Sequence, residues 1–461
     1  MALAREVADW VAAVRYEDLP ADVVSTTKLR ILDVLGLALA GAETRLGKAI
    51  VDGARAMSPP GPSRLVGTGE PVGVTTAAFA NAACAQVLEF DDTHNESIVH
   101  MSSPSLASGL ALAGTRPVTG RDLLLAMAVS SEIACRVGSV SPGHFHRRGF
   151  HPTGLFAPFG VAYGAGKLLG LGAEALAWAA GTVGSTAAGL LECWVDGTDT
   201  KFLHSGFAAQ NGVAAALLAA AGATGPPRVL EGRFGLFASH LQDANAARDF
   251  ARVTGGLGER WESRQASFKP FPAAHVLHPY ISAILRVRAG GVRAADVVRV
   301  VCPVAEFNVS IVCEPVAEKR APASQAHGRV CLQYTLAEAL WAGELGRHAY
   351  GDALRSSPDV LALARRVEYR VDPDYPGPGR FKGAVEVTLA DGRTIVEVEE
   401  HNRGSASNPM TVAELQAKFD DNASGFLDAA ARGRLAEVIE RTENLEDASA
   451  LVALTIGHRE V

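Results

Sequence analysis

The spacing of apolar residues predicts helices along most of the first 262 positions. Apolar side chains recur every three or four residues in VADWVAAVRY (7–16), VVSTTKLRILDVLGLALAG (23–41) and DLLLAMAVSSEIACRVG (122–138), which is the period of a helix with a buried face. Gly41 is placed to end the second of these helices, and Asp122 is placed to open the third. The uncharged stretch from about Ala175 to Leu191 is short and interrupted, so we interpret it as a buried helix rather than a membrane span.

The pattern changes after Trp261. FKPFPAAHVLHP (268–279) holds three prolines, and DVVRVVCPVAEFNVSIVCEP (296–315) is typical of a strand. VEYRVDPDYPG (367–377) and AVEVTLADGRTIVEVEE (384–400) alternate with a period of two, and Asp391-Gly392 is a strong hairpin signal. Helical spacing returns in TVAELQAKFDDNA (411–423) and LAEVIERTENL (435–445), where Thr411 and Glu414 form a capping box.

These changes predict a mainly α protein in three segments. A large helical domain is expected from residues 1–265 and 405–461, and a smaller α+β domain is expected from the inserted residues 266–404. The length of 461 residues supports two domains, since a single core rarely grows this large. A cleft between two domains is the usual place for a small-molecule site.

Composition narrows the functional classes. The formal net charge is −7 and no long basic run occurs, so we expect neither a nucleic-acid partner nor a membrane partner. The 47 glycines and the frequent alanines indicate closely packed helices. The six cysteines form no C-x-x-C pair, and we interpret them as reduced, buried thiols of a cytoplasmic protein. The N-terminal stretch has no unbroken apolar core and is not a signal peptide.

One short segment, LEFDDTHNESIVH (88–100), concentrates ionisable side chains between two apolar stretches. It contains Glu89, Asp91, Asp92, Thr93, His94, Glu96 and His100. A metal site is one interpretation, but no H-x-x-H or H-E-x-x-H spacing supports it. A catalytic loop is a second interpretation, in which a carboxylate orients a base and a histidine moves protons. A solvated loop whose acids cap helices is the third, and composition alone slightly favours it.

Three further clusters carry candidate chemistry. His151 precedes Pro152 and an apolar helix, where it could bind an anion, although a lone histidine is more often part of the core. Lys201 and His204 stand at the start of a long apolar segment, as functional groups or as surface groups. Lys269 lies at the expected domain boundary, where it could hold a carboxylate.

Two more positions complete the set of candidates. His275 and His278 are three residues apart and could share a helix face, although both could be structural. Tyr334 lies in an expected helix, VCLQYTLAEAL (330–340), where it is either a core residue or a hydroxyl donor that faces the cleft. The glycines near 160–166 do not follow a strand, so we reject a dinucleotide site.

The order and wording of these clusters resemble a known family. LEFDDTHNESIVH, GFHPTGLFAPFGVAYGAGKLLGL, KFLHSGFAAQNGVAAALLAAAGATGP, KPFPAAHVLHP and SASNPMTVAELQAKF are similar, in sequence order, to the signature segments of the MmgE/PrpD family. That family contains 2-methylcitrate dehydratase, cis-aconitate decarboxylase and iminodisuccinate epimerase. The resemblance extends to about residue 425 and implies a helical domain with an inserted α+β lid, a homodimer, an active site in the cleft, and no metal or organic cofactor.

The resemblance also implies a set of site residues. Positions that match the family motif are Thr93, His100, His151, Lys201, Lys269 and Tyr334. Three departures stand beside these matches. Glu89 occupies the position of an aspartate, Met101 replaces the proline that usually follows His100, and SQAHGRVCLQY (324–334) replaces a segment that usually contains DAKFS. These departures bear on the substrate more than on the fold.

The resulting hypothesis is a lyase that dehydrates or decarboxylates a small di- or tricarboxylate. Lys201 and Lys269 would neutralise the substrate and stabilise enolate-like charge, while His100 or His151 moves the proton. In the same hypothesis Glu89 orients a histidine, Tyr334 protonates a leaving group or carbanion, and Thr93, His204 and His278 contact the substrate. An epimerase or isomerase acting on a dicarboxylate is the alternative within this family. A member that binds carboxylates without turnover is a further alternative.

Overall fold

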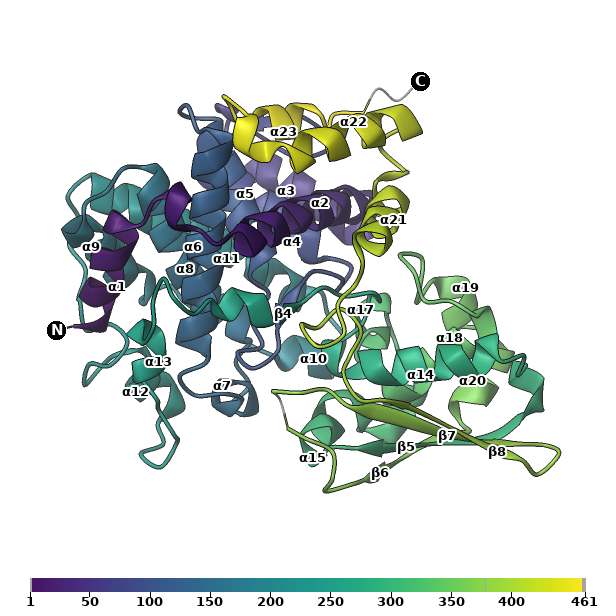
Figure 1. Cartoon of the computed structure of the whole chain (residues 1–461). Coiled ribbons are helices and arrows are strands. Elements are labelled where there is room, and N and C mark those ends of the chain that lie inside the picture. The colour runs from purple at the N-terminus through teal and green to yellow at the C-terminus, as the bar shows by residue number, and fades with distance from the viewer. Residues whose placement is uncertain (1, 378, 458–461) are drawn as a thin grey trace.

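The structure is a computed structural model that describes residues 2–377 and 379–457. The first part of the chain is helical, as the apolar spacing predicts (Figure 1). Its helices are α1 (Leu3–Ala13), α2 (Ala21–Glu43), α3 (Arg45–Met57), α4 (Val74–Gln86), α5 (Ser102–Ala113), α6 (Gly120–Gly138), α7 (His144–Arg147), α8 (Pro152–Leu168), α9 (Ala173–Val183), α10 (Glu192–Asp196), α11 (Thr200–Ala220), α12 (Leu236–Leu241) and α13 (Ala251–Thr254).

Small residues allow the central helices to pack closely. Helix α8 contacts α6 and α11, and α4 contacts α5 and α11. Every residue of α5 is buried, and so is every residue of α8 except Lys167. A Cβ atom on Gly160 would lie 2.1 Å from the carbonyl oxygen of Ser130, so only glycine permits this approach of α8 to α6. The high glycine content therefore serves helix packing.

The later part of the chain contains a small mixed sheet covered by helices. The strand order is β6-β5-β7-β8, with β5 parallel to β6 and antiparallel to β7. The strands of this sheet are β5 (Val297–Val304), β6 (Val367–Val371), β7 (Gly383–Leu389) and β8 (Thr394–Glu399). Two short strand pairs lie outside it, β1 (Ser63–Arg64) with β2 (Pro71–Val72) and β3 (Thr93–His94) with β4 (Ala266–Ser267). The helices are α14 (His278–Ala289), α15 (Glu306–Asn308), α16 (Val316–Arg320), α17 (Gln325–Gly328), α18 (Leu332–Ala342), α19 (Asp352–Arg355) and α20 (Pro358–Ala364).

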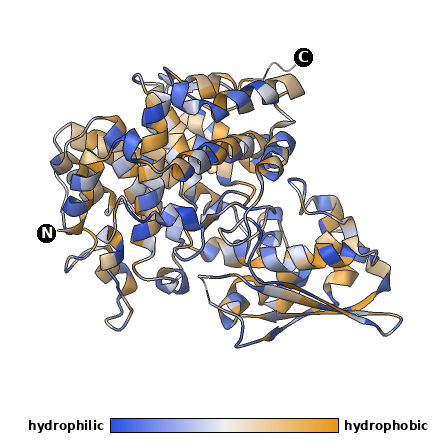
Figure 2. Cartoon of the chain, in the orientation of Figure 1, coloured by the Kyte–Doolittle hydropathy of each residue, from blue (hydrophilic) through white to orange (hydrophobic). Residues whose placement is uncertain are grey.

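Helix α14 covers one face of this sheet, contacting β7 and β8 on one side and α18 on the other. Figure 2 shows polar and apolar residues alternating along the strands, as expected for a sheet with one covered face. The hairpin predicted at Asp391-Gly392 is confirmed, since it joins β7 to β8 and Gly392 has a φ of 88°. The sheet has its own buried core, formed by residues between Ala273 and Leu389.

The last helices return to the first part of the molecule, where Figure 1 shows them in yellow beside α2 and above the sheet. They are α21 (Val412–Ala423), α22 (Ala429–Glu440) and α23 (Ala450–Ala453). Helix α21 packs on α2, and Phe419 joins the core that α2 and α4 form. The predicted capping box of Thr411 and Glu414 is confirmed. The expected boundaries at 265/266 and 404/405 stay a prediction, and residues 1, 378 and 458–461 of the expected segments lie outside the described residues.

Three local predictions are wrong. Helix α2 continues past Gly41 to Glu43, because Gly41 is needed for packing: its Cβ would lie 1.9 Å from the carbonyl oxygen of Cys84. Strand β5 ends at Val304, and 309–313 form a π-helix that buries Val312 and Cys313. The expected helix over 175–191 ends at Val183, after which the chain turns back along the start of α8.

The structure also bears on the interpretation of the cysteines and on the search for membrane-spanning helices. All six cysteines are free thiols and all are buried, as predicted. Among residues 2–377 and 379–457, no helix has the length and apolar character needed to cross a membrane.

Candidate active site

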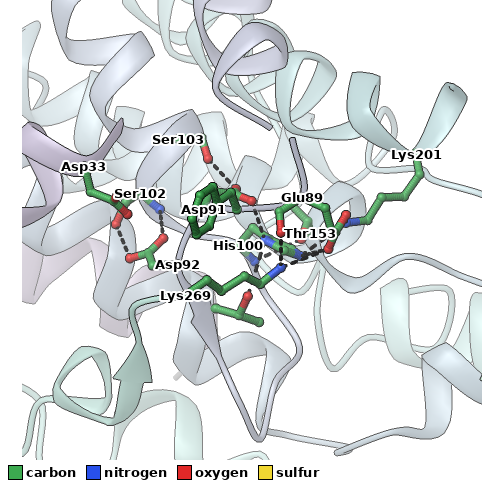
Figure 3. A network of polar contacts seen from close by, with 12 residues as sticks. Asp33, Glu89, Asp91, Asp92, His100, Ser102, Ser103, Thr153, Lys201 and Lys269 are labelled. Atoms are coloured by element: carbon green, nitrogen blue, oxygen red, sulfur yellow. Dashed lines mark hydrogen bonds and ion pairs between the residues drawn. The ribbon is translucent and has the colours of Figure 1, made fainter. Parts of the chain in front are cut away.

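A small cavity of about 50 Å³ lies where the loop between α4 and α5 meets residues of the later, sheet-containing part. Six of the predicted site residues line it: Glu89, Thr93, His100, His151, Lys201 and Lys269. All six are buried. The structure therefore brings together side chains that are up to 180 positions apart in sequence, and Figure 3 shows how several of them converge.

A short strand pair places the loop of 88–100 against the later part of the chain. Strand β3 pairs with β4 in antiparallel register, with Thr93 opposite Ser267. Lys269 follows two residues after this pair, which brings its ammonium group to Glu89. Glu89 has a φ of 54°, a left-handed conformation that is uncommon for a residue other than glycine. This backbone turn directs the Glu89 carboxylate into the cavity.

Two lysines share the carboxylate of Glu89. Lys269 Nζ donates to Glu89 Oε1 at 3.0 Å and to the Glu89 carbonyl oxygen at 3.0 Å. Lys201, in the first turn of α11, forms an ion pair with Glu89 Oε2. Burial raises the pKa of Glu89, but the charges of Lys201 and Lys269 outweigh it and hold that pKa well below its usual range. The interpretation of Lys201 as a surface lysine is wrong, because its side chain is 1% exposed.

His100 is oriented by a carboxylate. Its Nδ1 lies 2.9 Å from Asp91 Oδ1, and Asp91 Oδ2 accepts from the Ser103 hydroxyl at 2.6 Å. An ionised carboxylate only accepts, so Nδ1 carries the proton and Nε2 keeps its lone pair. This Nε2 lies 3.4 Å from Lys201 Nζ. Burial lowers the pKa of His100, Asp91 opposes that shift, and the lysines add to it. His100 therefore presents a neutral base to the cavity near pH 7.

A second imidazole pair lies beside the first. His151 precedes α8 as its N-cap residue, and its Nδ1 lies 3.0 Å from Nδ1 of His204. The backbone N–H of His151 donates to the carbonyl oxygen of Gly189, so the chain turn after α9 fixes its position. Burial holds the pKa of His151 well below its usual range, with Lys201 and His204 acting in the same direction. Its ring centroid lies 5.7 Å from that of His100.

Three predicted residues do not line the cavity. His204 lies behind His151 as its hydrogen-bond partner. His278 opens α14, with its Nε2 3.1 Å from the Ala273 carbonyl oxygen, and its neighbour His275 lines the cavity instead. Tyr334 is buried in α18 within the core of the later part, 6.2 Å from the ring of Tyr350. The structure thus separates Tyr334 from the other candidates.

Sequence reasoning missed several residues of the site. Asp91 is the acceptor that orients His100, yet nothing in its spacing distinguished it from the other acids of the loop. Asn402 Nδ2 lies 2.8 Å from His275 Nε2, and this pair joins positions 127 apart in sequence. Phe307 and Phe381 form apolar walls. None of these contacts follows a local pattern, so a signal for them would have required knowledge of the tertiary structure.

The interpretation of residues 88–100 as a solvated loop is wrong, because most of these residues are buried. The remaining acids do have structural partners, and Asp92 caps a helix as that interpretation predicts. Asp92 Oδ1 accepts from the N–H of Ser102 at 3.2 Å at the start of α5. Glu96 pairs with Arg252 at 2.7 Å. Among the described residues, no group of three or more His, Cys, Asp or Glu side chains is arranged to hold a metal ion.

Two domain models of one protein family match most of the chain. Residues 5–249 match the MmgE/PrpD N-terminal domain, and residues 271–444 match the MmgE/PrpD C-terminal domain. The chain is 26% identical over 468 residues to a cis-aconitate decarboxylase of Aspergillus terreus (strain NIH 2624 / FGSC A1156), covering 97% of this chain and 95% of that protein. It is 29% identical over 461 residues to the cis-aconitate decarboxylase of Homo sapiens, covering 94% and 90%. It is 27% identical over 429 residues to the 2-methylcitrate dehydratase of Cupriavidus necator, covering 85% and 83%.

Proposed function

The chain belongs to the MmgE/PrpD family, and we propose that it is a lyase that removes water or carbon dioxide from a small di- or tricarboxylate without a cofactor. The observation that carries this proposal is the arrangement of Lys201, Lys269 and His100 in one cavity. Two buried ammonium groups meet there beside a neutral imidazole, whose unprotonated Nε2 lies 3.4 Å from Lys201 Nζ. The distant decarboxylase and dehydratase relatives support the same class.

The lysines suit a reaction that develops charge next to a carboxylate. Each ammonium group has three N–H donors, and Glu89 with its carbonyl oxygen uses only part of them. The remaining donors are available for substrate carboxylates in a site with little water. Fixed cationic donors in such a site stabilise an enolate more than they stabilise the ground state, which lowers the barrier to proton transfer.

His100 and His151 divide the proton transfers in this proposal. In a dehydration, His100 Nε2 takes the proton from the carbon next to a carboxylate, and the electron pair forms the alkene. Hydroxide leaves as water with a proton from His151, which carries that proton once the negative charge of the bound substrate raises its pKa against the effect of burial. In a decarboxylation, carbon dioxide leaves with its bond electrons remaining on carbon, and His151, protonated in the same way in the substrate complex, supplies the proton to that carbon. Asp91 holds His100 in the tautomer with an unprotonated Nε2, which the dehydration requires.

The cavity must enlarge to admit such a substrate. Its volume is about 50 Å³, whereas pockets for small ligands usually begin at about 300 Å³. Its walls come from both parts of the chain, with Lys201 and His151 on one side and Phe307 and Phe381 on the other. Separation of these walls would open the site, and their return would exclude water from the lysines.

An epimerase on a dicarboxylate is the second candidate. The observation that favours it is the distance of 5.7 Å between the ring centroids of His100 and His151. Two imidazoles this close could hold one carbon atom between them. One would remove a proton from that carbon and the other would return a proton to the opposite face, with no group lost.

Proton NMR of the purified protein in D₂O tests both candidates. The panel consists of 2-methylcitrate, citrate, cis-aconitate and iminodisuccinate, each also incubated with a His100→Asn variant as the control. A new alkene or a lost carboxylate, absent with the variant, would establish the lyase and name its leaving group. Deuterium entering the carbon skeleton without loss of a group would replace the lyase by the epimerase. No change with any compound would contradict both.

A further inference from the structure

A second and larger cavity, of about 600 Å³, shares a wall with the active-site cavity. Val87, Leu88 and Phe202 line it, whereas their neighbours in sequence, Glu89 and Lys201, line the active-site cavity. The opposite side is formed by the segment around α17 and α19 of the later part. A hydrogen bond of 2.7 Å from the Ser324 hydroxyl to the Gly197 carbonyl oxygen joins the two parts near this cavity.

Four arginines line this second cavity, and three of them have carboxylate partners. Arg45 pairs with Asp199, Arg347 lies 3.4 Å from Glu43, and Arg355 pairs with Asp352 at 2.5 Å. These ion pairs consume the acids that line the cavity. The fourth arginine, Arg329, makes no ion-pair contact with the described residues, and the carboxylates of Glu89, Asp199 and Glu338 act on it only at longer range.

Arg329 is a buried cation with no carboxylate in ion-pair contact among the described residues. It is 4% exposed, and its guanidinium makes no hydrogen bond or ion pair with any residue that the structure describes, with Nε fully buried. Its Cζ lies 6.0 Å from the ring centroid of Phe202 and 5.7 Å from that of Tyr350. Aromatic faces stabilise a cation modestly, but burying a charge without a hydrogen-bonding counter-ion remains costly. A group that completes the hydrogen bonding of Arg329 would remove this cost.

We propose that the second cavity binds a small, multiply charged anion that carries carboxylate or phosphate groups, with Arg329 as its principal ligand. The planar guanidinium presents paired N–H donors that match the two oxygens of either group. The volume of about 600 Å³ falls within the usual range for small-ligand sites. This binding site is separate from the catalytic residues and requires no turnover, so it goes beyond the proposed lyase activity.

The position of the site gives the bound anion a route to influence catalysis. Phe202 contacts the cations of both cavities, since Lys201 Nζ lies 5.7 Å from its ring centroid and Arg329 lies on the ring at 6.0 Å. An anion held by Arg329 would reduce the positive field that Arg329 adds near Glu89 and Lys201. The second site could thus change the affinity of the active site for its own anion through electrostatics.

Isothermal titration of the full-length protein with citrate and, separately, with inorganic phosphate tests the proposal. The titrations use a Lys269→Met background, which weakens anion binding in the active-site cavity. We expect one citrate or one phosphate to bind, and adding Arg329→Gln to weaken that binding about tenfold or more, as loss of a charged hydrogen-bonding partner does. Adding Arg355→Gln instead is the matched control, because Arg355 lines the same cavity but pairs with the exposed Asp352, and it should change the affinity less than about threefold.

Each outcome of the titrations either supports or overturns an anion site at Arg329. Binding of citrate alone or of phosphate alone, lost with Arg329→Gln, would support the site and identify the source of its anion. Absence of binding at about 10 mM of either probe, or equal binding with and without Arg329, would overturn it. Circular dichroism and a melting curve check that Arg329→Gln is folded. If it is not, Arg329→Lys, which keeps the charge but loses the paired donors, should still weaken binding several-fold. Failure of this proposal leaves the NMR test of the lyase unaffected.

Discussion

Two adjacent aspartates, Asp91 and Asp92, belong to two different buried clusters of charged side chains. Figure 3 labels every member of the Asp91 cluster, and Asp33 beside Asp92 in the other. The catalytic cluster consists of Glu89, Asp91, His100, Lys201 and Lys269. The structural cluster consists of Arg30, Asp33, Asp92 and Lys418. Every one of these nine side chains is buried, so burial of charge does not by itself distinguish a functional site from a structural one.

What distinguishes the two clusters is whether their side chains line a cavity. In the structural cluster, Lys418 Nζ lies 2.7 Å from Asp33 Oδ1 and donates to the Phe90 carbonyl oxygen at 2.8 Å. Arg30 donates to the Ser263 carbonyl oxygen at 2.6 Å and lies 3.3 Å from Asp92. These contacts tie α2 to α21 and to the loop before α5. Four of the five catalytic side chains, all except Asp91, instead line a cavity, and each of the two lysines uses two of its three N–H donors on the residues that the structure describes.

The largest effect should come from removing the base of the catalytic cluster. His100→Asn keeps a donor for Asp91 but removes the lone pair of Nε2, so kcat should fall by about 10²–10⁴-fold, the usual contribution of general acid–base catalysis. The melting temperature should change little, because the asparagine side chain fills most of the same space. Initial rates with the substrate found by NMR, together with a melting curve, measure both quantities. Turnover near that of the wild type would show that His100 is not the base.

Asp91→Asn is the matched variant that tests how His100 is positioned. The Asp91 carboxylate raises the pKa of His100 against the effect of burial, so its replacement by a neutral amide should lower that pKa further. The acid limb of the kcat/KM profile, which reports the free enzyme, should then move to lower pH while the plateau falls. A lower plateau with an unshifted acid limb would mean that another group sets the pH dependence.

Local patterns predicted the secondary structure correctly in segments whose conformation does not depend on what they pack against. The helices of the first part, the hairpin at Asp391-Gly392 and the capping box of Thr411 and Glu414 all follow from spacing or turn chemistry. Gly41 was misjudged because its role depends on Cys84 in another helix. Residues 309–313 were misjudged because valine and isoleucine favour strands in general, whereas here they form one turn that buries Val312 and Cys313.

The sequence predicted most of the residues that line the candidate site, but it did not predict which of them contact one another. The lysines and histidines that line the cavity were chosen by resemblance and by their apolar surroundings. The pairing of Asp91 with His100 and the sharing of Glu89 by two lysines were not predictable, since each depends on how distant segments meet. Tyr334 shows the converse case: its place in a helix was correct, but its helix lies in the core of the sheet-containing part.

Removing one charged side chain from the structural cluster should lower the stability of the protein and leave the reaction rate unchanged. Lys418→Met removes the ammonium group that pairs with Asp33 and leaves a buried carboxylate, so the free energy of unfolding should fall by about 3–5 kcal/mol. Because Lys418 does not line the active-site cavity, kcat of the folded variant should stay near that of the wild type. Urea unfolding and a rate per folded molecule measure the two effects. A large loss of kcat with unchanged stability would reverse the roles assigned to the two clusters.

The smallest expected effect is on the pH dependence of folding stability, to which Asp33 and Glu89 should contribute in opposite directions. Burial raises the pKa of Asp33 to about 6 against the opposing charge of Lys418, whereas the ordinary value is 3.8. The native state therefore favours protonated Asp33, and its contribution to stability is complete below the ordinary value and lost as pH rises through about 6. The pKa of Glu89 is shifted the other way, so its contribution is present above its ordinary value of 4.5 and lost as pH falls.

Urea unfolding of the wild type, Asp33→Asn and Glu89→Gln between about pH 4 and pH 7 measures this contrast, since each variant removes one of the two titrations. The stability of the wild type minus that of Asp33→Asn should decrease by about 2–3 kcal/mol as pH rises from about 4 to 7, because each pKa unit corresponds to about 1.4 kcal/mol. The difference between the wild type and Glu89→Gln should change in the opposite direction. Parallel curves for Asp33→Asn and the wild type would mean that Asp33 titrates equally in the folded and unfolded chains, and that its pairing with Lys418 fully offsets its burial.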